Sequence, residues 1–279
     1  MLIIVTDKGY ARGGFLGALL VFLAACGGGG STPTTPTPPT TPGPSINACD
    51  AIGPAVSSQT AITNGSDCSA ENTSVVSLNM RAADGFNEGS CSGTIIAPRA
   101  VLTAAHCLDG DVRTVRVWLG SGDQIVAKSF HFHPDYRSIN TTALDVGVVL
   151  MEQDLGRGSI PLLFGREATV GETAVVAGWG RNLQSAGSVG TVLRAGTTTL
   201  SAVGSTLLET LFSTLASGIC QGDSGGPILL SEGGTWTIGG ITSAASTSVC
   251  HTGTHFYVNV RSTAIRSFIQ DHVPDAVVR

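Results

Sequence analysis

The hydrophobic positions of this chain fall in short runs. From about Val75 onward, β-branched and apolar residues recur in brief segments between clusters of Gly, Asn, Asp and Ser. Many short strands with turn signals between them are typical of an all-β barrel or sandwich. The clearest strands are predicted at 94–97, 114–119, 146–151, 173–177, 235–241 and 256–260.

One segment near the end of the chain has the spacing of a helix. Over 262–273, Ile265, Phe268 and Ile269 share one side, whereas Arg266 and Gln270 lie elsewhere. Apolar residues that recur every three or four positions give a helix one face to bury. We therefore predict a C-terminal helix packed on a β body.

Composition supports turn-rich β structure and excludes one class of partner. Charged residues make up only 13% of the chain, which also contains 37 Gly. The formal net charge is -5, without any run of Lys or Arg. Because nucleic-acid binding depends on basic side chains that neutralise phosphates, we expect no nucleic-acid partner.

The N-terminus has the pattern of an export signal. Basic residues precede an apolar run at 15–25, which is shorter than the roughly 20 residues that a membrane-spanning helix needs. The run ends in LAAC at 23–26, which resembles the lipobox of bacterial lipoproteins, where Cys26 would carry the lipid. The alternative is an ordinary signal peptide with an incidental Cys.

The chain then divides into four parts. Residues 1–26 are the predicted signal, and 27–44 form a spacer whose prolines favour an extended conformation. Residues 45–61 are a candidate propeptide, and 62–279 form the main domain. A lipid on Cys26 would hold the exported protein to a membrane of a bacterial cell envelope; without the lipid, the protein would be secreted.

The cysteine count suits an exported protein. Of the seven Cys, setting Cys26 aside leaves six. An even number in an exported chain predicts three disulfides, and six Cys allow fifteen pairings. No Cys/His cluster has the spacing of a zinc site, so we expect neither a metal nor another cofactor. The six are Cys49, Cys68, Cys91, Cys107, Cys220 and Cys250.

Two stretches contain residues suited to nucleophilic catalysis. In CQGDSGGP at 220–227, glycines on both sides of Ser224 let the backbone bend and bring N–H groups beside the hydroxyl, as an oxyanion site requires. The alternative is a flexible Gly/Ser turn. In LTAAHC at 102–107, His106 follows an apolar strand; the alternative is a structural histidine.

Asp145 is the candidate acid, because an apolar strand follows it directly. Together with Ser224 and His106 it would complete a Ser-His-Asp set. The other acids considered are expected on solvated loops. They are Asp109, Asp111, Asp123, Asp135 and Asp154.

These segments resemble the trypsin/chymotrypsin family, whose TAAHC and GDSGGP segments both occur unaltered. Further landmarks follow in order over roughly residues 62 to 272: CSGT at 91–94, with Ser92 where many members have Gly, HPDY at 133–136, DVGVVL at 145–150, GWG at 178–180 and FYVNV at 256–260. The resemblance implies two six-stranded antiparallel β-barrels with a C-terminal helix. The active site would lie in the cleft between them.

The resemblance also implies a serine endopeptidase that acts on proteins or peptides, as a monomer without a cofactor. His106 would take the proton of Ser224, and Asp145 would hold the imidazole. Backbone N–H groups of Gly222 and Ser224 would receive the oxyanion. The alternatives are a non-catalytic surface protein that binds partners on the same fold, or a structural lipoprotein; the presence of all three catalytic residue types favours the enzyme.

Disulfide pairing and activation follow from the same resemblance. It implies Cys91–Cys107 and Cys220–Cys250, which leaves Cys49 and Cys68 to pair. It also implies that the amine of a new N-terminus at Ile62 would pair with Asp223. Because Ala61 precedes Ile62, a protease that does not require Lys or Arg would have to make the cut. The competing view keeps 45–61 continuous with the domain.

The residues of the specificity pocket are also taken from the resemblance. Gly218, six residues before Ser224, stands where the family places an Asp to select Arg and Lys, and Ile219 is apolar. The segment Ser243–Ala245 resembles a pocket wall. A basic side chain buried there without a partner would cost several kcal/mol, so we predict a preference for small or medium apolar residues. His255 would favour acidic substrates instead, if it reaches the pocket.

Overall fold

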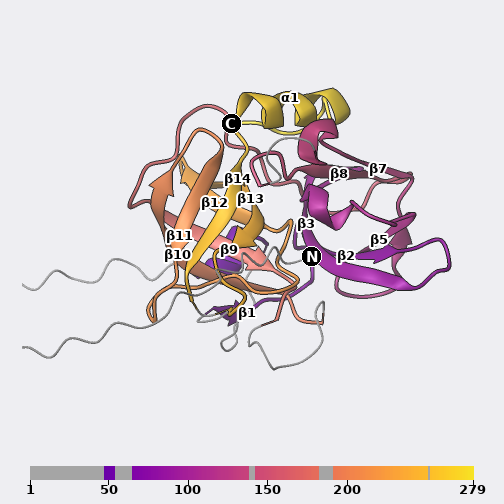
Figure 1. The fold of residues 1–279 in the computed structure, drawn as a ribbon, viewed down its shortest axis with the longest axis horizontal. Helices are drawn as coiled ribbons and strands as arrows, with labels where there is room; N and C mark the ends of the chain where they lie inside the picture. Colours follow the sequence, from indigo (N-terminus) through magenta and orange to yellow (C-terminus); the bar gives the residue numbers. More distant parts are fainter. Residues whose placement is uncertain (1–46, 54–64, 138–141, 182–190, 251) are drawn as a thin grey trace, which may run out of the picture. The chain divides into compact units, whose positions relative to one another are not determined.

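Antiparallel strands make up most of the computed structural model, which describes residues 47–53, 65–137, 142–181, 191–250 and 252–279 (Figure 1). The first sheet has the order β6-β5-β2-β3-β4-β8-β7. Its strands are β2 (Val75–Arg81), β3 (Asn87–Ala97), β4 (Ala100–Thr103), β5 (Thr114–Trp118), β6 (Ile125–Val126), β7 (Ser129–Phe132) and β8 (Gly147–Leu150).

The second sheet has the order β1-β10-β11-β14-β13-β12-β9, and β9 also pairs with β10. That extra pairing closes a barrel of six strands, with β1 at its edge. The strands are β1 (Ser66–Asp67), β9 (Thr173–Gly178), β10 (Arg194–Val203), β11 (Leu207–Leu211), β12 (Pro227–Glu232), β13 (Thr235–Ala245) and β14 (Thr254–Asn259).

The predicted all-β fold with a C-terminal helix is confirmed, with one correction to the barrels. Only the second sheet is a closed six-stranded barrel. The first is a half-barrel of seven strands, because its edge strands β6 and β7 do not pair with each other in the described part of the chain. The six strands predicted from hydrophobic runs are all present, as β3, β5, β8, β9, β13 and β14.

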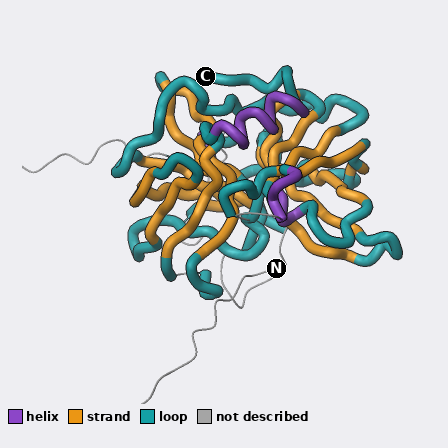
Figure 2. Tube along the Cα trace, turned by 45° about the horizontal axis from the view of Figure 1, so that its top comes forward, coloured by secondary structure: helices purple, strands orange, loops and turns teal. Residues whose placement is uncertain are grey.

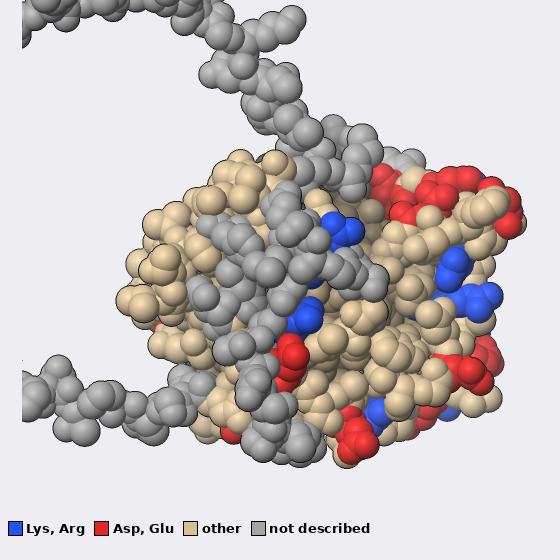
Figure 3. Space-filling view, turned by 90° about the horizontal axis from the view of Figure 1, so that it is seen from below, with Lys and Arg blue, Asp and Glu red and all other residues tan. Residues whose placement is uncertain are grey.

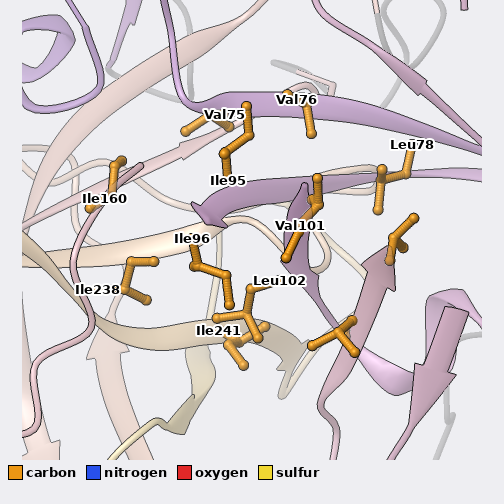
Figure 4. Packing of buried hydrophobic residues seen from close by; sticks show 14 of the residues in the cluster. Val75, Val76, Leu78, Ile95, Ile96, Val101, Leu102, Ile160, Ile238 and Ile241 are labelled. Carbon is orange, nitrogen blue, oxygen red and sulfur yellow. The ribbon is translucent and has the colours of Figure 1, made fainter. Parts of the chain in front are cut away.

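The larger of two buried apolar clusters contains residues of both sheets. Val75 and Ile95 of the first sheet belong to the same buried cluster as Ile238 and Ile241 of β13. In Figure 4, Ile96 and Leu102 lie beside Ile241. Fully burying such a side chain is worth about 1.5 to 3 kcal/mol. Loops that leave the two sheets are therefore held in a fixed relation to each other.

The C-terminal helix α1 (Thr263–His272) follows the second sheet in sequence but packs on the first (Figures 1 and 2). Ile265, Phe268 and Ile269 are buried, as predicted. The ring centroids of His272 and His131 of β7 lie 4.9 Å apart, and those of Phe268 and His133 lie 5.7 Å apart. Among the residues described, no helix has the length and apolar character needed to span a membrane.

Part of the candidate propeptide belongs to the folded domain. The short 3₁₀-helix η1 (Ala48–Ala51) is buried, with Cys49 bonded to Cys68. The amide N of Ser74 donates to the carbonyl O of Ile52 over 3.1 Å. Ala48, Ala51 and Ile52 are thus part of the core. Cys26, with the rest of the predicted signal and spacer, lies outside the described residues.

Candidate active site

Strand pairing brings His106 and Asp145 together. Thr103 at the end of β4 pairs with Gly147 at the start of β8. His106 follows Thr103 in the 3₁₀-helix η2 (Ala105–Cys107), and Asp145 precedes Gly147. Because antiparallel strands place the end of one beside the start of the next, the two side chains meet. Nδ1 of His106 lies 2.7 Å from Oδ2 of Asp145.

The buried Asp145 carboxylate accepts two further hydrogen bonds. The backbone N of His106 donates to Oδ1 over 2.8 Å, and the hydroxyl of Ser243 donates to Oδ2 over 2.5 Å. Burial, together with the nearby negative charge of Asp145, raises the pKa of Tyr136 to about 12. Ser243 was predicted as a pocket wall only, whereas its hydroxyl faces Asp145. The other five acids considered are exposed or half-buried.

The turn that contains Ser224 lies against the His106 loop. The carbonyl O of Ser224 is 3.9 Å from Sγ of Cys107. Gly225 has a φ of +79°. Its amide N donates a hydrogen bond to the carbonyl O of Thr242 over 2.8 Å. A Cβ at Gly225 would collide with the side chain of Thr103, so only glycine allows this approach. Among the described residues, no hydrogen bond joins the Ser224 hydroxyl to the His106 ring; such bonds often tighten only when substrate binds.

Ser92 in β3 belongs to the site, although the sequence analysis predicted no role for it. Its backbone N donates to Ser224 O over 2.8 Å, and its hydroxyl donates to Gly222 O over 2.8 Å. The same hydroxyl accepts from the N of Trp179 over 2.9 Å. The first sheet thereby holds the Ser224 turn directly. The one signal in the sequence was the replacement of the family's usual Gly by Ser92.

The backbone around Ser224 offers two donors. Gly222 has a φ of +95°, which favours glycine. Neither the N–H of Gly222 nor that of Ser224 donates to an acceptor within the described ranges. An oxyanion site requires backbone donors without an intramolecular acceptor, and in the described ranges both groups meet this requirement.

Asp223 is a second buried carboxylate, only 2% exposed. Oδ1 accepts from the N of Gly180 and Oδ2 from the N of Cys220, both over 2.8 Å. Burial raises the pKa of Asp223 to about 6, although these hydrogen bonds and the charge of Arg194 oppose the rise. A Cβ at Gly180 would overlap the carboxylate, which explains the second glycine of GWG. Ile62, its predicted partner, lies outside the described residues.

Of the predicted pocket residues, Gly218 and His255 lie side by side. A Cβ on Gly218 would lie 2.7 Å from Cε1 of His255 and 2.7 Å from Cδ2 of Phe212. His255 is buried and pairs in register with Ala245 of β13. Ile219 is also buried. Phe212, which no sequence motif marked as a candidate, therefore shares the space beside Gly218 with His255.

Three disulfides are present: Cys49–Cys68, Cys91–Cys107 and Cys220–Cys250. They are the three pairs expected above. The only group of His, Cys and acidic ligand atoms close enough for a metal ion, among residues that the structure describes, is Cys91, Cys107 and His106. Because both sulfurs belong to one disulfide, this group does not hold a metal.

Comparisons with known proteins show the family to which this chain belongs. The Trypsin family model matches residues 62–269, and the chain belongs to this family. Chymotrypsin-like elastase family member 1 of Bos taurus is 28% identical over 227 residues, which cover 72% of this chain and 84% of that protein. Trypsin alpha of Drosophila melanogaster is 32% identical over 164 residues, covering 50% of this chain and 63% of that protein.

The fold is also that of a solved structure, a mutant of human heparin binding protein. The TM-score is 0.62 at 21% identity, and the match covers 76% of this chain and 97% of that chain. The named relatives come from animals, so the bacterial lipoprotein assignment stays a prediction. The comparisons and the fold together define a trypsin-like serine peptidase family, for which protein or peptide substrates are the rule.

Replacing Ser92 by Ala tests the link between the first sheet and the Ser224 turn. Ser92→Ala would leave the buried N–H of Trp179 without its acceptor, so we expect a loss of about 1 to 3 kcal/mol in the free energy of unfolding. The measurement is urea unfolding. Ser90→Ala, also in β3, removes a half-buried hydroxyl that bonds to Asn79 and should cost less. Equal losses would contradict the role given to Ser92.

The pH dependence of stability tests the state of Asp223. Its pKa is raised from 3.8 to about 6, so its contribution to stability is full below pH 3.8 and is lost as the pH rises through 6. Between pH 4 and 7 the uncleaved chain should lose about 2 to 3 kcal/mol relative to Asp223→Asn. Urea unfolding in a Ser224→Ala background avoids self-digestion. The control is Asp154→Asn, which changes an exposed carboxylate. If the chain with Asp223 intact shows the same pH dependence of stability as Asp223→Asn, the raised pKa of Asp223 is contradicted.

Proposed function

We propose that this protein is a serine endopeptidase that hydrolyses peptide bonds through an acyl-enzyme. The observation that carries the proposal is the hydrogen-bonded line from Ser243 through Asp145 to His106, with the Ser224 turn against the His106 loop. A buried carboxylate that orients an imidazole beside a serine is the arrangement that activates a hydroxyl for attack.

The roles of the residues follow from their positions. Ser224 attacks the peptide carbonyl while His106 takes the proton from its hydroxyl, and His106 then gives this proton to the leaving amine. Asp145 keeps Nδ1 of His106 protonated and the ring in place. The N–H groups of Gly222 and Ser224 stabilise the oxyanion, each donor being worth about 3 kcal/mol. Water then releases the acyl group by the same path.

The preferred residue before the cleaved bond is short or medium in length. The rings of Phe212 and His255 occupy the space beside Gly218. A long substrate side chain would collide with these rings. Ile219 and Ala245 offer apolar contacts. The three atoms nearest to a Cβ placed on Gly218 belong to His255 and Phe212, and neither side chain offers a negative charge to a buried Lys or Arg. These observations support the preference for small or medium apolar residues.

A peptide panel tests both the chemistry and this preference. We expect hydrolysis after Ala, Val and Leu, none after Lys or Arg, and a fall in kcat of about 10⁴ in Asp145→Asn, because the imidazole then adopts the wrong tautomer. Fluorogenic peptides provide the measurement, with the exposed Asp135→Asn as the control. Cleavage confined to Lys and Arg would contradict the preference, and full activity in Asp145→Asn would contradict the mechanism.

We also propose that cleavage after Ala61 activates the enzyme, through an ion pair between the Ile62 amine and Asp223. The segment just after Ile62 is tied to Asp223: Asp67 Oδ1 accepts from Arg194 Nε over 3.1 Å, and Arg194 also donates to Gly180 O over 2.9 Å. The amide N of Gly180 in turn donates to the Asp223 carboxylate. A buried carboxylate with a raised pKa gains most from a new cation.

Chemical analysis of active enzyme tests this cleavage. Terminal sequencing should find Ile62, and the leader should stay attached through Cys49–Cys68 until the protein is reduced. Intact mass before and after reduction shows the attachment. An Asp154→Asn chain should be processed and active, whereas Asp223→Asn should be processed but weakly active. Full activity in a chain intact at Ala61 would contradict the proposal.

For the location of the protein, we propose export to a bacterial cell envelope, where a lipid on Cys26 anchors it. The alternative is secretion without the lipid. The proposed anchor rests on the LAAC segment and on the Pro- and Thr-rich spacer that follows it. Residues 47–53 are built into the domain, so a lipid on Cys26 would tether the enzyme even after cleavage at Ala61. The domain would act as a monomer on protein or peptide substrates.

A second candidate function is binding without catalysis, which the resemblance to heparin binding protein brings into view. Binding a polyanion requires a basic surface. This chain has a net charge of -5, and on the face drawn in Figure 3 the basic side chains form small separate groups between acidic ones. The charge distribution therefore favours the enzyme over a protein of that kind.

A further inference from the structure

His255 is a buried residue of β14 that lies next to Gly218. It pairs in register with Ala245 of β13 and with Thr210 of β11. Its ring lies so close to Gly218 that a Cβ there would be 2.7 Å from Cε1. The ring of Phe212 packs against it edge-on, with centroids 6.5 Å apart. The imidazole is thus held beside the residue that lies six positions before Ser224.

The imidazole of His255 has no polar partner in the part of the chain that the structure describes. The residue is 1% exposed, and neither Nδ1 nor Nε2 makes a hydrogen bond. An imidazole always carries at least one N–H donor, and buried polar groups in proteins are nearly always paired. The neighbouring hydroxyls of Tyr257 and Thr210 bond to each other over 3.2 Å instead. A ligand is therefore the natural source of a partner.

The distance from the reacting groups suits a substrate side chain. Ser243, which bonds to Asp145, and Ala245, which pairs with His255, are two positions apart on β13. A strand rises about 3.3 Å per residue, and the register shift between Thr242 and Ala244 shortens the step, so Ala245, opposite His255, lies at most about 7 Å from Ser243 along β13. A side chain that passes Ser243 and Ala245 would bring its end to the ring, and its methylene groups would contact Ile219 and Ala245.

We infer that His255 is a specificity-determining residue that binds the carboxylate of a Glu or Asp side chain before the cleaved bond. The inference rests on the proposed protease function and adds acidic substrates to the apolar ones. A ring N–H donates to the carboxylate, and a proton taken up from solvent can turn the contact into an ion pair. No group transfer beyond the proposed peptide hydrolysis is involved.

The acidic groups near His255 would not repel a carboxylate bound to its ring. Glu209 of β11 pairs with Phe256, so it lies on the other face of the sheet from His255. Both carboxylate oxygens of Asp223 accept backbone hydrogen bonds, and the Tyr257 hydroxyl is engaged. Burial alone lowers the pKa of His255 to about 4, with no contribution from a neighbouring charge. The free ring is therefore neutral at pH 7, and a bound carboxylate would raise its pKa.

Matched peptides that differ only before the cleaved bond test the inference on the full, activated chain. We expect kcat/KM for Glu to exceed that for its isostere Gln, and His255→Phe to lower the Glu-to-Gln ratio by about 10- to 100-fold. The Phe ring keeps the planar shape but has no nitrogen. The control is His133→Phe, a buried histidine that packs on Phe268, which should leave the ratio unchanged. The inference is overturned if wild type has the same kcat/KM for the Glu and Gln peptides. It is also overturned if His255→Phe leaves the Glu-to-Gln ratio of wild type unchanged.

A binding measurement separates this inference from the proposed catalysis. In Ser224→Ala with labelled histidine, an NMR titration should show the His255 pKa rising by about one unit or more with a product peptide ending in Glu, and not with one ending in Gln. No response to either peptide overturns the inference. If His255 of Ser224→Ala responds to the Glu peptide but the wild-type enzyme hydrolyses no peptide, only the proposed protease function is contradicted. If the wild-type enzyme cleaves after Leu but not after Glu, only the role of His255 is contradicted.

Discussion

The contact between Ser92 and the Ser224 turn is the interaction on which the site depends. Catalysis by a serine, a histidine and an aspartate needs their positions fixed to within a fraction of an ångström, yet here they come from two separate sheets. Ser92 in the first sheet bonds to the carbonyl groups of Ser224 and Gly222. The shared core behind it, with Ile96 next to Ile241, makes that contact rigid.

Two buried carboxylates show how the same fold sets different electrostatic conditions. Asp145 accepts hydrogen bonds from the backbone and ring of His106 and from Ser243, which together compensate its burial. Asp223 accepts two backbone hydrogen bonds, and burial still raises its pKa to about 6. The first group suits permanent orientation of an imidazole. The second suits a role in which a cation arrives later, as the proposed activation requires.

Much of the fold was predictable from sequence because its strands are short hydrophobic runs between turn residues. The half-barrel was not, since closure depends on whether distant edge strands such as β6 and β7 pair, and local patterns do not contain that information. His106 and Ser224 were identifiable from motifs that match unaltered, and Asp145 from the apolar strand that follows it directly. The contacts of Ser92, Ser243 and Phe212 were not, because the local sequence around a residue does not reveal which distant side chain packs against it. His255 was a candidate by alignment, but its unpaired burial is a property of the packed structure.

The most direct test of the central claim is reaction of the folded chain with a fluorophosphonate probe, comparing wild type with Ser224→Ala by intact mass. An activated serine attacks phosphorus, whereas an ordinary hydroxyl does not, because only a general base held beside it removes its proton. We predict one adduct per chain in the enzyme cleaved at Ala61, and none in Ser224→Ala. A cleaved, folded wild-type chain that forms no adduct would contradict catalysis at Ser224 and favour the non-catalytic binding protein.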